Sequence, residues 1–184
     1  MAANKEVWYL EERLRQEIAL SIKDFGLPKY EDIPDIGMFL DQVTKYISKY
    51  MEPLESITIT SSMISNYVKM GLIESPIKKQ YYTEQIACLI FITLAKSVLS
   101  LEDIRICMEN QKQICDMRMS YEYFREEFER TLFRVFGLED RSENAGKEEA
   151  QEKIMLRNTV ITVAHKVYLD KCFSRLCKEK QDRD

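Results

Sequence analysis

Glycine, proline and histidine are scarce in this chain of 184 residues. Five glycines and four prolines leave few positions for the tight turns and phosphate-binding loops on which sheet-rich and nucleotide-binding proteins depend. The sequence contains neither G-x-G-x-x-G nor a P-loop, and its one histidine, His165, has no nucleophile motif beside it. We therefore expect a mostly helical, all-α protein that is not an enzyme.

Neither sign of charge dominates the composition. The chain has 27 lysines and arginines against 31 aspartates and glutamates, which gives a net charge of −4. This balance excludes a uniformly basic nucleic-acid wrapper, and the acidic excess is too small for a polyacidic tail. Apolar residues make up 45% of the chain, which is enough to bury a sizeable core. Any contact with nucleic acid must therefore come from a local patch.

Long apolar runs and paired cysteines are also missing. The longest strongly apolar stretch, about residues 85–95, is too short to cross a bilayer, and the charged N-terminal residues lack the apolar segment of a signal peptide. No cysteines form a C-x-x-C pair, and one histidine argues against zinc. We expect no membrane partner, metal or cofactor, and a cytoplasmic location with reduced thiols at Cys88, Cys107, Cys115, Cys172 and Cys177.

Apolar spacing predicts the elements of the N-terminal region. Residues 4–24 repeat apolar side chains every three or four positions, which predicts an amphipathic helix that ends at Gly26. Two glycines and two prolines in residues 26–37 predict an extended strap, packed by Leu27, Tyr30, Ile33 and Ile36. A helix from Pro34 or Asp35 to Tyr50 is expected to turn Phe39 inward.

The central region contains the clearest helix start and stop signals. Thr and Ser residues precede a short helix over residues 61–70, which Gly71 closes. Thr83 is expected to cap an apolar core helix. Ser100 and Asp103 have capping-box spacing at the start of a helix over residues 101–115.

The C-terminal region is predicted to form two longer helices. The first starts near Met119 and ends at Gly137, and a charged loop over residues 139–150 follows it. The last helix, from about Glu148 to Cys177, has two apolar rows that predict partners on more than one side, with His165 partly buried between them. We divide the chain into an N-terminal helix (1–25), a central domain (26–115) and a dimerisation or sensing region (116–184).

The strongest functional signal is the short helix over residues 61–70 and the basic segment after it. Apolar residues such as Ile64 and Val68 occupy one side, and small polar side chains occupy the other. Ser and Asn bond base edges and Lys reaches phosphate, so such a helix suits the DNA major groove. Residues 56–82 contain three lysines and one glutamate, a local charge of +2. The candidate DNA-binding residues are Ser61, Ser62, Ser65, Asn66, Tyr67, Lys69, Lys78, Lys79 and Tyr81.

The order of these elements resembles the winged helix-turn-helix of MerR-type transcriptional regulators. The matching residues run from the short helix to the start of the helix after the core helix, namely Ile64, Tyr67, Gly71, Leu72, Ile73, Tyr82, Thr83, Leu89, Leu99, Ser100, Leu101, Glu102, Asp103 and Ile104. Segments 26–43 and 63–82 are more similar still to a bacterial family known only as a domain of unknown function and regarded as MerR-like. The resemblance covers about residues 26–106.

The resemblance implies a regulator that binds double-stranded DNA as a homodimer through its C-terminal helices, and it leaves room for a small-molecule effector. The chain departs from the MerR pattern at Ser65, where those proteins usually carry Arg two positions before the matched Tyr. The connector before the short helix is also longer than in a simple helix-turn-helix. The alternative is therefore a non-enzymatic helical module that uses the same fold to hold a protein partner. A continuous basic surface would favour DNA, and an apolar patch would favour a protein.

Overall fold

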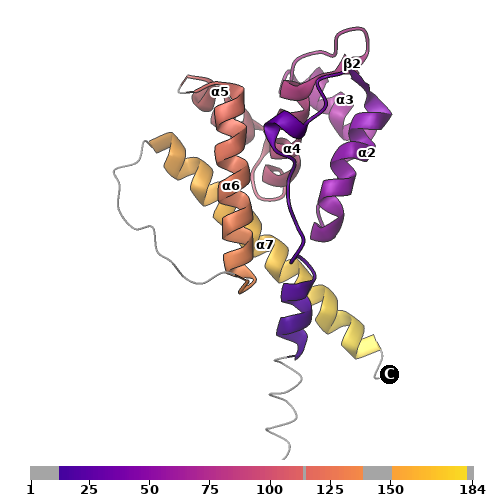
Figure 1. The fold of residues 1–184 in the computed structure, drawn as a ribbon, viewed down its shortest axis with the longest axis vertical. Helices are drawn as coiled ribbons and strands as arrows, with labels where there is room; N and C mark the ends of the chain where they lie inside the picture. The colour runs from indigo at the N-terminus through magenta and orange to yellow at the C-terminus, as the bar shows by residue number, and fades with distance from the viewer. Residues whose placement is uncertain (1–12, 114, 139–150, 182–184) are drawn as a thin grey trace, which may run out of the picture.

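A computed structural model describes residues 13–113, 115–138 and 151–181, apart from the side chains of residues 151–155, 173 and 176–181. The described residues are mostly helical and include one two-stranded antiparallel sheet, which broadly confirms the all-α expectation (Figure 1). The elements are η1 (Tyr30–Asp32), β1 (Met38–Phe39), α2 (Leu40–Met51), η2 (Glu52–Leu54), α3 (Ser61–Lys69), β2 (Gln80–Tyr81), α4 (Thr83–Ala95), α5 (Leu101–Lys112), α6 (Met117–Val135) and α7 (Gln151–Gln181).

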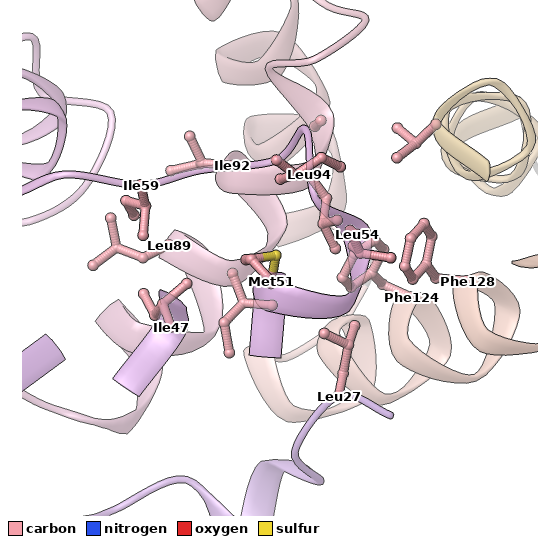
Figure 2. Packing of buried hydrophobic residues seen from close by; sticks show 14 of the residues in the cluster. Leu27, Ile47, Met51, Leu54, Ile59, Leu89, Ile92, Leu94, Phe124 and Phe128 are labelled. Carbon is pink, nitrogen blue, oxygen red and sulfur yellow. The ribbon is translucent and has the colours of Figure 1, made fainter. Parts of the chain in front are cut away.

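Helix α4 forms the centre of the core, as its apolar sequence predicts. Eight of its residues are buried, on all sides of the helix, because α2, α6 and α7 each pack against it. Figure 2 shows Leu89 and Ile92 of α4 in one cluster with Ile47 of α2 and Phe128 of α6. The buried cluster is continuous from Ile18 to Val167, so one core joins the N-terminal, central and C-terminal regions.

Helix α6 holds the segment that leads from residue 26 to α2. The Leu27 N–H donates to Glu129 Oε1 (2.8 Å), and the Tyr30 N–H donates to Glu122 Oε1 (2.5 Å). Arg125 lies between both carboxylates, at 2.9 Å from Glu122 Oε2 and 3.0 Å from Glu129 Oε2. The expected strap is therefore present, with one 3₁₀ turn inside it. Ile36, expected to pack inward, is instead exposed.

The strap continues into a strand, and this corrects the predicted start of the next helix. Met38 and Phe39 pair with Tyr81 and Gln80, so α2 begins at Leu40 and not at residue 34 or 35. Gly37 allows this pairing, because a Cβ there would lie 2.8 Å from the Gln80 side chain. Phe39, expected to face the core, is exposed on the sheet.

The predicted boundaries of the later helices need smaller corrections. Ser100 caps α5 as expected, and its Oγ accepts from the Asp103 N–H at 3.1 Å. The residue at the N-cap of α4 is Tyr82, not Thr83, and the Tyr82 N–H donates to Gln85 Oε1 at 2.9 Å. The Thr83 hydroxyl instead donates to the Pro34 carbonyl at 3.1 Å. Helix α6 begins at Met117, two residues earlier than predicted.

The two ends of the chain agree with the predicted pattern only in part. Residues 13–20 are helical and 21–24 form turns, whereas positions 4–12 of the predicted helix and the predicted 139–150 loop lie outside the described residues. One apolar row of α7 (Leu156, Val160, Val163 and Val167) is buried against the chain's own helices, chiefly α6. His165, expected to be partly buried, is exposed. No helix in the described ranges combines the length and apolarity that a membrane span needs.

Candidate nucleic-acid interface

Helix α3 is fixed at both ends. The Thr60 hydroxyl accepts from the Met63 N–H at 3.2 Å and caps the first turn. At the other end Gly71 has φ +67°, and the Leu72 N–H donates to the Tyr67 carbonyl at 2.9 Å, as in a Schellman motif. The guanidinium of Arg105 from α5 also donates to the Met70 carbonyl at 2.7 Å. The exposed face of α3 is therefore held in a defined position.

The outer face of α3 carries most of the predicted contact residues. Ser62, Ser65, Asn66 and Lys69 are exposed. The Ser65 hydroxyl donates to the Ser61 carbonyl at 2.9 Å, so this side chain folds back on its own helix. Asn66 Nδ2 lies 3.4 Å from the sulfur of Met70, a weak acceptor, so the amide of Asn66 is available to a stronger partner.

Three of the candidate residues occupy different surroundings from those that the sequence suggested. Tyr67 and Tyr81 are only 3% and 4% exposed, and burial raises the pKa of both phenols. Their rings belong to the core, which corrects the prediction that they contact DNA. Ser61 is half-buried, and its hydroxyl donates to Asp41 Oδ1 at 3.2 Å. Ser61 therefore anchors α3 to α2.

Lys78 and Lys79 form the tip of a two-residue hairpin turn. The Ile77 N–H donates to the Gln80 carbonyl at 3.0 Å, and the Gln80 N–H donates back to the Ile77 carbonyl at 2.9 Å. Both lysines have positive φ, +50° and +67°, which is the pattern of a type I′ turn. Asn-Gly is the usual pair in such a turn, so two lysines here carry backbone strain. The two lysines are exposed, and the turn holds both of them at the tip of the hairpin.

The outer face of the small sheet carries two large apolar side chains. Phe39 lies opposite Gln80 in β2, and Gln80 lies opposite Ile77, so the three side chains share one face. Phe39 is 52% exposed and Ile77 is 62% exposed, and the nearby Ile36 is 73% exposed. We call Ile36, Phe39 and Ile77 the apolar wing residues. The surface that continues from α3 is therefore basic at the hairpin tip and apolar beside it.

The charges around α3 are of both signs. Within the described residues, Lys69, Lys78 and Lys79 form no ion pair, so all three remain available to an anion. Asp41 places a negative charge at the N-terminal end of α3. There it interacts favourably with the helix dipole but would repel a phosphate group. The basic surface is therefore concentrated at the C-terminal end of α3 and at the hairpin tip.

One cation beside α3 was missed by sequence reasoning. Lys96 and Ser62 both line a shallow hollow of about 500 Å³ between α3 and the start of α5. The ammonium of Lys96 donates to the Thr58 carbonyl at 2.6 Å, and burial lowers its pKa. In the sequence, Lys96 only follows an apolar helix, and nothing local shows that it folds back against residue 58.

The described part of the chain gives no sign of a metal centre. No group of three or more His, Cys, Asp or Glu side chains is placed to bind an ion there. Cys88, Cys107, Cys115 and Cys172 are free thiols, while the Cys177 side chain lies outside the described set.

Part of the chain matches a known protein family. A family model described as "Domain of unknown function (DUF1836)" matches residues 28–128, from the strap into α6. No curated protein and no solved structure matches the chain. The matched segment contains α3, the hairpin and the capped helices α4 and α5. It also contains residues 117–128 of α6, which the 26–115 domain leaves out, and among them Glu122, which accepts from the Tyr30 N–H.

Proposed function

The chain belongs to the family described as Domain of unknown function (DUF1836), and we propose that it is a sequence-specific DNA-binding regulator of transcription with a MerR-like winged helix-turn-helix. In this proposal α3 enters the major groove and the Lys78–Lys79 turn lies over the phosphate backbone. The protein acts in the cytoplasm. Its residues 116–184 form the region that dimerises or senses an effector.

One observation carries this proposal. Helix α3 has a buried apolar side and an exposed side of Ser62, Asn66 and Lys69, is fixed at both ends, and leads into a hairpin with two lysines at its tip. A rigid polar helix can present hydrogen-bonding groups to base edges, and cations beside it can position the duplex. The strained conformation of the two lysines also suits a functional tip.

The alternative is a protein-binding module, and the apolar wing residues favour it. Ile36, Phe39 and Ile77 are large, exposed and located on or next to one small sheet. Exposed apolar groups that gather in this way are typical of protein interaction sites. Ser65, in place of the usual Arg, also removes one cation from α3. The variants described below decide between the two functions.

We predict that loss of a base-edge contact and loss of a phosphate contact have different effects on DNA affinity. After recovery of the bound genomic DNA identifies a preferred site, Asn66→Ala should weaken that site by about 1–3 kcal/mol and random DNA very little. Lys78→Ala and Lys79→Ala should weaken all sequences alike. Each should also reduce the slope of log affinity against log salt by about one, because one phosphate contact is lost. Fluorescence anisotropy at several salt concentrations measures both effects.

The control for this experiment is Ile64→Ala, because Ile64 lies on the buried side of the same helix. It should lower stability by roughly 2–5 kcal/mol and show what simple loss of folding does to binding. If Asn66→Ala, Lys78→Ala and Lys79→Ala all stay folded and bind DNA like the natural protein, the proposed surface is wrong. A loss of partner binding on Phe39→Ala and Ile77→Ala would then support the protein-binding alternative.

We also propose a homodimer held mainly by residues after about 116. The buried row of α7 is already covered within the chain, so the contact must use other groups such as Leu169, which is 51% exposed. Leu169→Lys is expected to halve the mass measured by sedimentation at micromolar concentration. The matched control is Leu20→Lys, because Leu20 is 58% exposed but lies before residue 116. A monomeric natural protein, or equal effects of both variants, would contradict the proposal.

A further inference from the structure

A cavity of about 260 Å³ lies between α4, α5 and α6, and Leu156 of α7 contributes to its wall (Figure 1 shows the helices). Helix α4 lines it with Ala87, Cys88 and Phe91, and these positions share one helix face. Helix α6 lines it with Ser120, Tyr121 and Phe124, which also share one face. Three regular helices therefore build the cavity.

The interior of the cavity is made of sulfur and aromatic side chains. The sulfurs of Cys88 and Met117 lie 3.8 Å apart, and the rings of Phe91 and Phe124 meet edge to face with centroids 5.1 Å apart. Met108 adds a second thioether to the lining. Burial raises the pKa of the Cys88 thiol to about 12, so this thiol is neutral at physiological pH. The interior therefore offers polarisable contacts and disfavours a charged group.

The rim of the cavity carries charges of both signs. Glu84, Lys112 and Asp116 line it and are exposed, and within the described residues Glu84 and Lys112 form no ion pair. The carboxylate of Asp116 already has a partner, because it accepts a hydrogen bond from the Met119 N–H at 2.8 Å and caps α6. The mixed rim selects neither an anion nor a cation. The Ser120 hydroxyl, 3.0 Å from the Cys115 sulfur, supplies a neutral hydrogen-bonding group on the wall.

We propose that this cavity binds a small uncharged aromatic molecule that carries one hydroxyl or N–H group. The ring lies among the sulfur and aromatic side chains of α4 and α6, and the polar group bonds to Ser120. An apolar cavity of about 150 Å³ accommodates a benzene molecule, so this larger space suits a ring system bigger than one benzene ring. The proposal does not depend on DNA binding, because its evidence and its test use only the cavity.

A series of three probes tests the chemistry of the ligand. 2-Naphthol is neutral, 2-naphthoate is an anion and 2-naphthylmethylammonium is a cation, and the ring is the same in all three. In the full chain with ¹³C-labelled methionine methyl groups, 2-naphthol should shift the signals of Met108 and Met117 in a saturable way. The signals of Met51 and Met70, which do not line the cavity, should stay in place. The charged probes should bind at least about ten-fold more weakly.

Two substitutions at one position test the location. Cys88→Phe fills the cavity and should weaken 2-naphthol binding at least about ten-fold, whereas Cys88→Ala leaves the space open and should change it by less than about three-fold. Equal binding of 2-naphthol by the two variants contradicts the proposal. So does binding of the charged probes as tight as that of 2-naphthol. If Cys88→Phe does not fold, the methionine signals of the natural protein decide alone, and their failure to shift overturns the proposal.

Discussion

Replacing Phe128 by alanine is expected to lower the free energy of unfolding by about 3–5 kcal/mol. Phe128 is fully buried, and its ring lies 5.9 Å from that of Phe25 and 6.0 Å from that of Phe124 (centroid distances; Figure 2 shows Phe124 and Phe128). It therefore joins the N-terminal segment to α6 in one core. The loss of stability has two parts. The burial free energy of the large ring is lost, and the cavity that the ring leaves adds a further cost.

Urea unfolding followed by circular dichroism measures this loss. The matched control is Met119→Ala on the same helix, which removes a large apolar side chain that is exposed. It should change stability by no more than about 0.5 kcal/mol. If both variants lose the same stability, α6 does not pack in the core as the structure places it.

Local signals in the sequence predicted the parts of the fold that depend on short-range chemistry. Gly71 ends α3 because a left-handed residue is needed there, and Ser100 starts α5 because its hydroxyl bonds a nearby N–H. The sequence of α4, which is apolar on most sides, likewise predicted a central core helix, and eight of its residues are buried. These features are decided within about one helical turn, so spacing alone was enough.

The features that the sequence did not predict depend on residues far apart in the chain. Phe39 is exposed because it pairs with Gln80, forty-one positions later, and no local pattern encodes that pairing. The turn at Lys78 and Lys79 lacks the Asn or Gly that marks such turns. His165 is exposed because α6 packs against the opposite row of α7, and the sequence does not show which row is covered.

The candidate site was predicted in the same uneven way. The exposed residues of α3 follow from helical periodicity, and Asn66 and Lys69 do face outward. Tyr67 and Tyr81 were predicted to contact DNA because one lies in the short helix and the other follows Lys79, but the packing of α3 and β2 buries both rings. Lys96 and Arg105 were missed because their partners, the carbonyls of Thr58 and Met70, are distant in sequence.

Breaking the ion pair between Glu55 and Lys171 is the second large effect that we expect. The ammonium of Lys171, a residue only 3% exposed, lies 3.0 Å from the carboxylate of Glu55, whose side chain is 48% exposed. Glu55→Ala leaves this buried charge without that partner and should lower the free energy of unfolding by roughly 2–3 kcal/mol. This is less than the 3–5 kcal/mol typical of fully buried pairs, because water reaches the Glu55 side.

A double-mutant cycle measured by urea unfolding isolates the pair. Lys171→Met removes the charge and keeps most of the buried stem, so the combined variant should be more stable than Glu55→Ala alone. Glu55 also has φ +56° and ψ −60°, and the Ser56 N–H donates to the Leu54 carbonyl at 2.6 Å, which is a strained γ-turn. Glu55→Gly should therefore be less destabilising than Glu55→Ala, by about 1 kcal/mol. Additive single effects would show that the two charges do not interact.

This pair also connects α7 to the segment that leads into α3. Glu55 and Ser56 precede α3 by only a few residues, and the Ser56 hydroxyl donates to Asp170 of α7 at 2.6 Å, next to Lys171. Two neighbouring side chains of α7 thus hold the start of this connector. If α3 reads DNA as proposed, Lys171→Met should weaken binding to the preferred site and leave the salt slope unchanged, because no phosphate contact is lost. Lys78→Ala should weaken binding to all sequences alike and also reduce the salt slope, so the slope distinguishes loss of a phosphate contact from loss of α3 positioning.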